Sequence, residues 1–303
     1  MPRNEFQQER GTLDAFLKQG RPSGSIETLT LGGFGCPITR RGTGQPIICI
    51  HGLGHDQWDF SPLFERFQEG FELIALDLPG FGLAQKRNDE QALPTFDTLV
   101  EAVRELVAAC CEPPILVGSS LGGHVAIQLA LNEPTSVLGM ILVSPGGLQT
   151  HSTGEAHFFR EYYSFRTIRN RSPDEIKANN RRIFATPSQK SDELSGRKLA
   201  IHHSAQSDSF AAAFASVVDD VLNYSVEETI SDLKTPFVFV FGEHDVVVPP
   251  SLGVATAKRL NKEIYLISGA SHLPMVECPN EFAQIVFGLS RGFQSIPKGG
   301  GLC

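Results

Sequence analysis

Val117-Gly118-Ser119-Ser120-Leu121-Gly122-Gly123 is the stretch of this 303-residue chain that decides its fold. An apolar run leads into it, and residues 124–130 continue from it as a helix-like segment. Gly118 and Gly122 flank Ser120 at the Gly-x-Ser-x-Gly spacing, which is typical of a serine held on a tight turn between a strand and a helix. Side chains at the glycine positions would collide with neighbouring backbone. The spacing predicts an exposed Ser120 hydroxyl beside a helix N-terminus, which favours negative charge. A plain serine and glycine linker is the alternative.

The composition is that of a soluble globular protein, with 41% hydrophobic residues and a formal net charge of −8. The acidic balance argues against a nucleic-acid partner. The polar N-terminus lacks the apolar core of a signal peptide, and no stretch approaches the ~20 apolar residues of a membrane span. Six cysteines in a chain of this length do not form a disulfide framework. We therefore expect a cytoplasmic protein with no membrane span.

Apolar runs and amphipathic segments alternate along the chain, which predicts a parallel sheet covered by helices on both faces. The expected strands are 46–50, 71–76, 114–118, 139–144, 236–241 and 263–267, and the expected helices include 98–107, 121–132, 252–260 and 282–289. Residues 26–31 alternate with period two, which favours an antiparallel edge hairpin with the run near Ile38. The fold class predicted by these patterns is α/β.

The alternation stops after residue 147 and resumes near residue 236. Residues 148–228, called the helical insertion from here on, are poor in strand pattern and rich in charged and aromatic residues. We expect two units, a core formed by residues 1–147 and 229–303 and the helical insertion between them. An insertion after the strand at 139–144 emerges at the carboxyl edge of the sheet, beside Ser120.

A serine hydroxyl needs a base within hydrogen-bond reach, and the base needs an acid to orient it. His272 follows the last expected strand, so we expect it at the same sheet edge as Ser120. Asp245, after the strand at 236–241, is the expected acid, and Glu243 is its competitor. His51, His55 and His244 also lie in loops at the sheet edge and compete for the role of base. The order Ser, Asp, His at successive strand ends favours catalysis over three unrelated loop residues.

A hydrolytic site also needs donors for a developing oxyanion. His51-Gly52-Leu53-Gly54 follows the strand at 46–50, and its glycines leave backbone N–H groups free to point into a pocket. We expect the N–H groups of Leu53 and Leu121 to form the oxyanion hole. A simple turn is the alternative interpretation of the glycine loop.

Several of these motifs, taken in order, resemble the α/β-hydrolase superfamily: residues 46–54, the stretch Asp77-Leu78-Pro79-Gly80-Phe81-Gly82, the Ser120 turn, and the segments 242–245 and 269–272. The resemblance covers residues 25–147 and 230–292. It implies an eight-stranded, mostly parallel sheet, a triad of Ser120, His272 and Asp245, and no cofactor. We expect no metal either, because the His202-His203 pair lacks metal-ligand spacing. It also implies that the helical insertion is a cap that covers the active site and sets the substrate.

The resemblance implies a serine hydrolase of the carboxylesterase type that cleaves a small to medium, partly apolar ester through an acyl-enzyme on Ser120. We expect Trp58, Phe159 and Tyr163 to line the substrate pocket. A hydrolase of carbon–carbon bonds is one alternative, although members of that group typically carry Gly-Asn-Ser-Met-Gly-Gly where this chain has Ser119 and Leu121. Other α/β-hydrolase chemistry, such as a lyase step or perhydrolysis, is a second alternative, and a ligand-binding receptor that uses the same fold is a third. The basic run 166–182 either contacts an acidic substrate or forms a solvated helix face.

Overall fold

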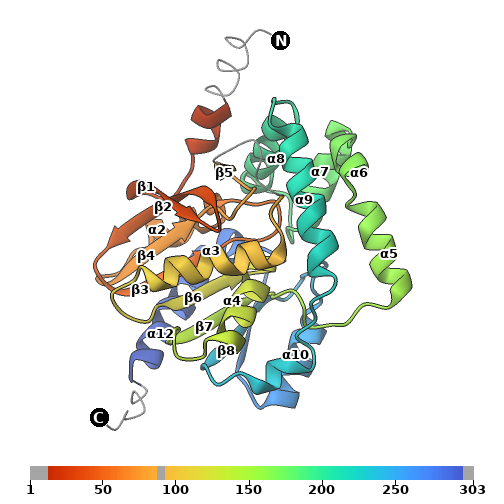
Figure 1. The fold of residues 1–303 in the computed structure, drawn as a ribbon. Coiled ribbons are helices and arrows are strands. Elements are labelled where there is room, and N and C mark those ends of the chain that lie inside the picture. The colour runs from red at the N-terminus through yellow and green to blue at the C-terminus, as the bar shows by residue number, and fades with distance from the viewer. Residues whose placement is uncertain (1–12, 87–92, 296–303) are drawn as a thin grey trace.

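The computed structural model describes residues 13–86 and 93–295. At its centre lies one twisted sheet with the strand order β1-β2-β4-β3-β6-β7-β8-β9, and a short strand β5 pairs with β2 (Figure 1). The strands are β1 (Ser25–Leu31), β2 (Phe34–Gly42), β3 (Gly44–Ile50), β4 (Gly70–Leu76), β5 (Gln85–Lys86), β6 (Ile115–Ser119), β7 (Gly139–Val143), β8 (Phe237–Gly242) and β9 (Ile264–Ile267).

Six neighbouring strands, from β4 through β3, β6, β7 and β8 to β9, are paired in parallel. β1 and β2 form the antiparallel hairpin expected at this edge, and β2 pairs antiparallel with β4. The predicted fold class, a mostly parallel sheet of the α/β-hydrolase type, is therefore confirmed. Because the parallel strands run in one direction, the loops that follow β3, β6, β7, β8 and β9 all gather at one edge of the sheet.

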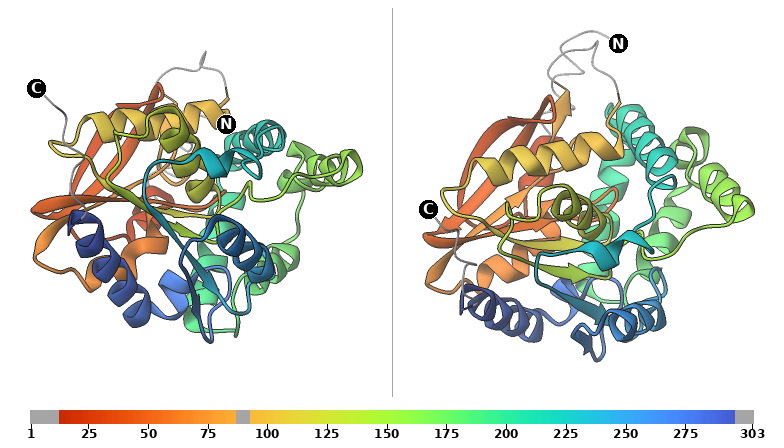
Figure 2. Two further views of the ribbon diagram at one scale, coloured as in Figure 1. Left: turned by 90° about the horizontal axis from the view of Figure 1, so that it is seen from below. Right: turned by 60° about the horizontal axis from the view of Figure 1, so that its bottom comes forward.

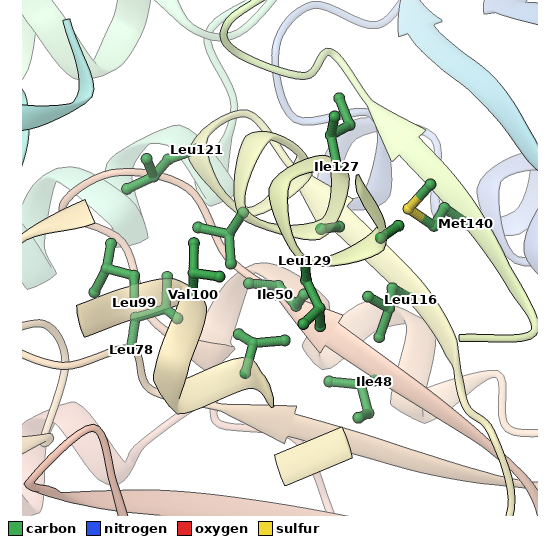
Figure 3. Close-up of a cluster of buried hydrophobic side chains, with 14 of the residues drawn as sticks. Ile48, Ile50, Leu78, Leu99, Val100, Leu116, Leu121, Ile127, Leu129 and Met140 are labelled. Atoms are coloured by element: carbon green, nitrogen blue, oxygen red, sulfur yellow. The ribbon is translucent and has the colours of Figure 1, made fainter. Parts of the chain in front are cut away.

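Successive side chains of the buried strands face opposite sides of the sheet, so the core has two halves. In β3, Ile48 and Ile50 belong to one apolar cluster, and Ile47 and Cys49 belong to the other. Helices α3 (Phe96–Ala108) and α4 (Leu121–Asn132) cover the first half, and α12 (Pro279–Ser295) covers the second (Figure 2). Figure 3 shows the first half, where side chains of β3 and β6 meet those of α3 and α4. Because these strands are buried on both faces, their sequences are apolar at successive positions.

The segment between β7 and β8 is helical and adds no strand to the sheet. Its helices are α5 (Thr153–Tyr162), α6 (Phe165–Arg169), α7 (Pro173–Arg182), α8 (Gln189–His202) and α9 (Ser207–Val221). Figure 1 shows them gathered beside one end of the sheet. Helices α5 to α8 each begin at a serine N-cap, whose side chain accepts a free N–H group of the first turn. A buried ion pair, Arg197 to Asp56 at 2.7 Å, joins α8 to the loop after β3.

Four further short helices are η1 (Gln57–Phe60) and α2 (Ser61–Glu65) after β3, η2 (Thr229–Asp232) before β8, and α11 (Pro274–Glu277) after β9. Helix α10 (Pro250–Leu260) connects β8 to β9. None of the helices within residues 13–86 and 93–295 is long and apolar enough to cross a membrane.

Candidate active site

Ser120 lies on the turn between β6 and α4. Its backbone φ is 52°, a value that residues other than glycine rarely adopt. The two flanking glycines allow this turn to pack closely. A Cβ atom at Gly118 would lie 2.4 Å from the carbonyl oxygen of Gly122, and one at Gly122 would lie 2.2 Å from that of Ile50. The backbone N–H of Ser120 donates to Val143 O at 2.9 Å, which ties the turn to the end of β7. The turn is thus strained and held rigid, as expected for a positioned serine.

Asp245 and His272, which come from the loops after β8 and β9, are joined directly. The Nδ1 atom of His272 lies 2.8 Å from Oδ2 of Asp245. The other carboxylate oxygen, Oδ1, accepts the backbone N–H groups of Val247 and Val248 at 2.8 and 3.0 Å. Since both backbone groups are donors, they fix the orientation of the carboxylate and leave Oδ2 for the histidine.

This pair is shielded from water, since Asp245 and His272 are each only 5% exposed. Burial raises the pKa of Asp245, whereas the hydrogen bond and the charge of His272, together with Ser144 and the Val248 N–H, lower it, so that the net pKa lies below its ordinary value. Asp245 therefore stays ionised wherever a histidine base works. An ionised acceptor at Nδ1 keeps the proton on that nitrogen and leaves Nε2 as the basic atom.

The competing residues named from the sequence lie elsewhere. Glu243 accepts a hydrogen bond from the Ser268 hydroxyl at 2.9 Å and is exposed. The Nδ1 atom of His55 contacts Asp59 at 2.9 Å, and His244 is exposed. His51 is fully buried and its ring is bonded to backbone on both sides. Geometry thus singles out Asp245 as the carboxylate that contacts His272.

Ser120 shares the carboxyl edge of the sheet with this pair, because β6, β7, β8 and β9 are consecutive neighbours. No hydrogen bond within the described parts of the chain joins the Ser120 hydroxyl to His272. Such bonds are often long in ligand-free sites and tighten when substrate binds.

The loop after β3 lies against Ser120, since a Cβ atom at Gly52 would be 3.4 Å from that of Ser120. His51 shapes the loop. Its Nε2 accepts the Leu78 N–H at 2.9 Å, so its Nδ1 carries the proton and donates to Gly52 O at 2.8 Å. Neither the Leu53 N–H nor the Leu121 N–H donates to any residue that the structure describes. Both expected oxyanion donors are therefore available to a ligand.

A cavity of about 180 Å³ lies between the core and the helical insertion. Leu53 and His55 of the core form one side of it. The other lining residues come from the helical insertion: Tyr163, Ile168, Arg171, Ile176, Asn179, Asn180, Ile183, Lys198, His202, Ser207, Phe210 and Phe214. Its size fits a small ligand, because drug-sized pockets start at about 300 Å³. The cavity adjoins the site at two points, through Leu53 and through Ile183, whose carbonyl accepts the His272 N–H at 3.1 Å.

The three expected pocket residues have different surroundings. Tyr163 lines the cavity and packs on Phe214, with ring centroids 5.5 Å apart. Phe159 stacks on the far side of Tyr163, at 6.4 Å, and is not part of the cavity wall. Trp58 is buried in the second half of the core, beneath Lys190, and lines only a minor recess of about 10 Å³.

Sequence reasoning missed Glu277, which joins the His272 loop to the helical insertion. Its carboxylate accepts the Ser271 N–H at 2.7 Å and the Ala185 N–H at 2.6 Å. Burial raises the pKa of Glu277 above its ordinary value. Its position five residues after His272, on a short helix, was the only signal that could have pointed to it. The cavity residues of α8 and α9 were missed as well, because their side chains follow no motif.

Several known proteins are similar to this chain in sequence or in structure. The pimeloyl-[acyl-carrier protein] methyl ester esterase of Pseudoalteromonas atlantica is 26% identical over 249 residues, which cover 80% of this chain and 92% of that protein. A thermophilic esterase from Thermogutta terrifontis is similar in structure with a TM-score of 0.74 and 21% identity, covering 89% of this chain and 99% of the other. A bacterial membrane phospholipase A also has a TM-score of 0.74, with 22% identity and coverage of 97% and 92%. The last two likenesses concern the fold alone.

The family to which the chain belongs is shown by a match over most of its length. The model of the alpha/beta hydrolase family matches residues 47–285, which span the Ser120 turn, Asp245, His272 and the whole helical insertion. The resemblance stated from the motifs is thereby confirmed, and the chain belongs to the alpha/beta hydrolase family.

Proposed function

We propose that the protein is a serine esterase that hydrolyses a small, partly apolar carboxylic ester through an acyl-enzyme on Ser120. The observation that carries the proposal is the buried bond of 2.8 Å between His272 Nδ1 and Asp245, at the sheet edge that carries Ser120 on its strained turn. The esterases among the relatives support the same chemistry.

In the proposed mechanism, His272 Nε2 takes the proton of the Ser120 hydroxyl as its oxygen attacks the ester carbonyl carbon. The carbonyl oxygen becomes an oxyanion that accepts the Leu53 and Leu121 N–H groups. Each such donor typically contributes about 2.7–4 kcal/mol to transition-state stabilisation. His272 then gives its proton to the leaving alcohol as the carbon–oxygen bond breaks. Water repeats the cycle on the acyl-enzyme and releases the acid.

Labelling with a fluorophosphonate probe, followed by assay with p-nitrophenyl acetate, tests this function. We expect one probe molecule per chain, attached to Ser120, and a loss of ester turnover in proportion to labelling. Peptide mapping identifies the labelled residue. If the probe labels Ser120 but the protein hydrolyses no ester, the receptor alternative is favoured. If ester hydrolysis survives full labelling, Ser120 is not the nucleophile.

The helical insertion, as the proposed cap, is expected to set substrate size through Tyr163. Replacing Tyr163 with alanine removes an aromatic wall of the cavity, so longer acyl chains should be accommodated. Each additional buried methylene is worth about 0.8 kcal/mol, or about fourfold in specificity. The measurement is kcat/KM over a series of p-nitrophenyl esters of increasing acyl length.

The matched control for this prediction is Phe159→Ala, because Phe159 stacks on Tyr163 without lining the cavity. We expect it to shift the preferred chain length much less. An unchanged length preference in Tyr163→Ala would contradict the assignment of this cavity to the substrate.

A further inference from the structure

In the part of the chain that the structure describes, the wall of the cavity carries cationic and amide side chains but no carboxylate. Among the described residues that line it there is no aspartate or glutamate, whereas Arg171 and Lys198 are cations and Asn179 and Asn180 carry amides. Of the basic run 166–182, Arg171 alone lines this cavity; its neighbour Arg169, by contrast, pairs with Asp208. The interior therefore presents hydrogen-bond donors and positive charge without an acidic side chain to balance them.

Lys198 is the clearest of these groups. Its ammonium forms no hydrogen bond or ion pair with any residue in the described ranges, and it lies 5.9 Å from the centre of the Phe210 ring. Burial lowers its pKa to about 8, although Asp59 and Asp56 act in the opposite direction. Those two carboxylates are bonded to His55 and Arg197, and neither lines the cavity. At pH 7 Lys198 is still mostly charged, and no carboxylate within the described ranges contacts it directly.

Asn180 provides a second and independent observation. It is 8% exposed, and its Nδ2 atom is buried without a partner among the described residues. An unpaired buried amide donor is costly, so such groups usually face a ligand or an ordered water. Arg171 donates to the carbonyl of Tyr162 at 3.2 Å and has no carboxylate partner within the described ranges. Asn180 of α7, Lys198 of α8 and Arg171 of the turn before α7 thus line one cavity.

The rest of the wall is mixed. It has apolar residues, among them Ile168, Ile176, Phe210 and Phe214, beside the polar side chains of His55, Tyr163, His202 and Ser207, and Leu53 connects the cavity to the expected oxyanion hole. We propose that this cavity binds a carboxylate, so that the substrate is a small ester carrying a free carboxylate separated from the ester by a short apolar chain. This inference rests on the proposed function. The carboxylate would accept hydrogen bonds from Lys198 and Asn180 and be attracted by Arg171, while the chain would pack against the aromatic rings.

The first test compares three methyl esters at pH 7: monomethyl adipate, dimethyl adipate and methyl hexanoate. Hydrogen bonds to a charged group are worth about tenfold or more, so we expect kcat/KM for monomethyl adipate to exceed the other two by at least that factor. The preference should reside mainly in KM, because the carboxylate is held equally in the ground and transition states. Equal rates for the three esters would overturn the inference while leaving the esterase function in place.

Variants assign the preference to the named residues. Lys198→Met and Asn180→Leu should each reduce the ratio of kcat/KM for monomethyl adipate to that for methyl hexanoate by about tenfold. Lys177→Met is the matched control, because Lys177 is exposed on α7 and does not line the cavity. Lys198→Arg should restore most of the ratio. A ratio unchanged in both Lys198→Met and Asn180→Leu would refute the proposed contacts.

Direct binding separates this inference from the proposed function. Calorimetric titration with adipate, which cannot be hydrolysed, reports on the cavity without any turnover. We expect binding to the unmodified protein and a loss of at least about tenfold in affinity in Lys198→Met. If adipate binds in this way but no ester is turned over, the proposed function fails and the carboxylate site stands. If esters are hydrolysed but adipate does not bind, the carboxylate site fails alone.

Discussion

Ser120→Ala is expected to lower kcat/KM for p-nitrophenyl acetate by about 10⁴-fold or more, with the fold intact. The hydroxyl is the only part lost, and the substitution keeps the Cβ atom on a turn whose φ of 52° is imposed by packing against β3 and β7. Steady-state kinetics gives the loss, and thermal unfolding checks that the midpoint is unchanged. Activity within about tenfold of the unmodified protein would exclude Ser120 as the nucleophile.

Ser119 is the matched control for this substitution. It is the last residue of β6, directly before Ser120, is fully buried, and its hydroxyl has no partner among the described residues. Ser119→Ala removes an unsatisfied polar atom, so we expect little change in activity or stability. A loss of activity in Ser119→Ala as large as that in Ser120→Ala would mean that the turn, rather than one hydroxyl, is responsible.

The sheet and the Ser120 turn could be predicted because their signals are local. Strands buried on both faces must be continuously apolar, and β3 and β6 are. The glycines around Ser120 are required by contacts with backbone only a few residues away or on the neighbouring strand, such as Gly122 against Ile50. Because parallel strands run in one direction, the loops that follow them lie at one edge of the sheet. The sequence therefore predicts that Asp245 and His272 lie close together, and the structure joins them at 2.8 Å.

The cavity could not be predicted in the same way, because its wall is made by the packing of helices that share no sequence motif. In the sequence, Lys198 and Asn180 are ordinary polar residues of amphipathic helices. Only the packing of α7 and α8 shows that they line the cavity. An aromatic cluster indicates burial but not which surface is buried. Tyr163 therefore lines the cavity, whereas Phe159, four residues earlier, stacks behind it.

The choice between Asp245 and Glu243 also needed the structure, since both follow β8 within three residues of each other. The turn directs Asp245 toward His272 and leaves Glu243 with Ser268 at the surface. Asp245→Asn is expected to reduce kcat by about 10⁴-fold, whereas Glu243→Gln should stay within about threefold of the unmodified protein. Parallel kinetic measurements on the two variants check the ranking, and the reverse ranking would make Glu243 the acid.

The size of the effect at Asp245 follows from hydrogen-bond polarity. The N–H groups of Val247 and Val248 both point at Oδ1, so an asparagine must place its carbonyl oxygen there and turn its NH₂ group toward His272. That NH₂ group is a donor, so His272 Nδ1 has to become the acceptor and the ring proton moves to Nε2. Nε2 can then no longer take the proton of Ser120, and the imidazolium also loses its negative neighbour. Because the backbone fixes this orientation, the loss should persist from neutral to alkaline pH.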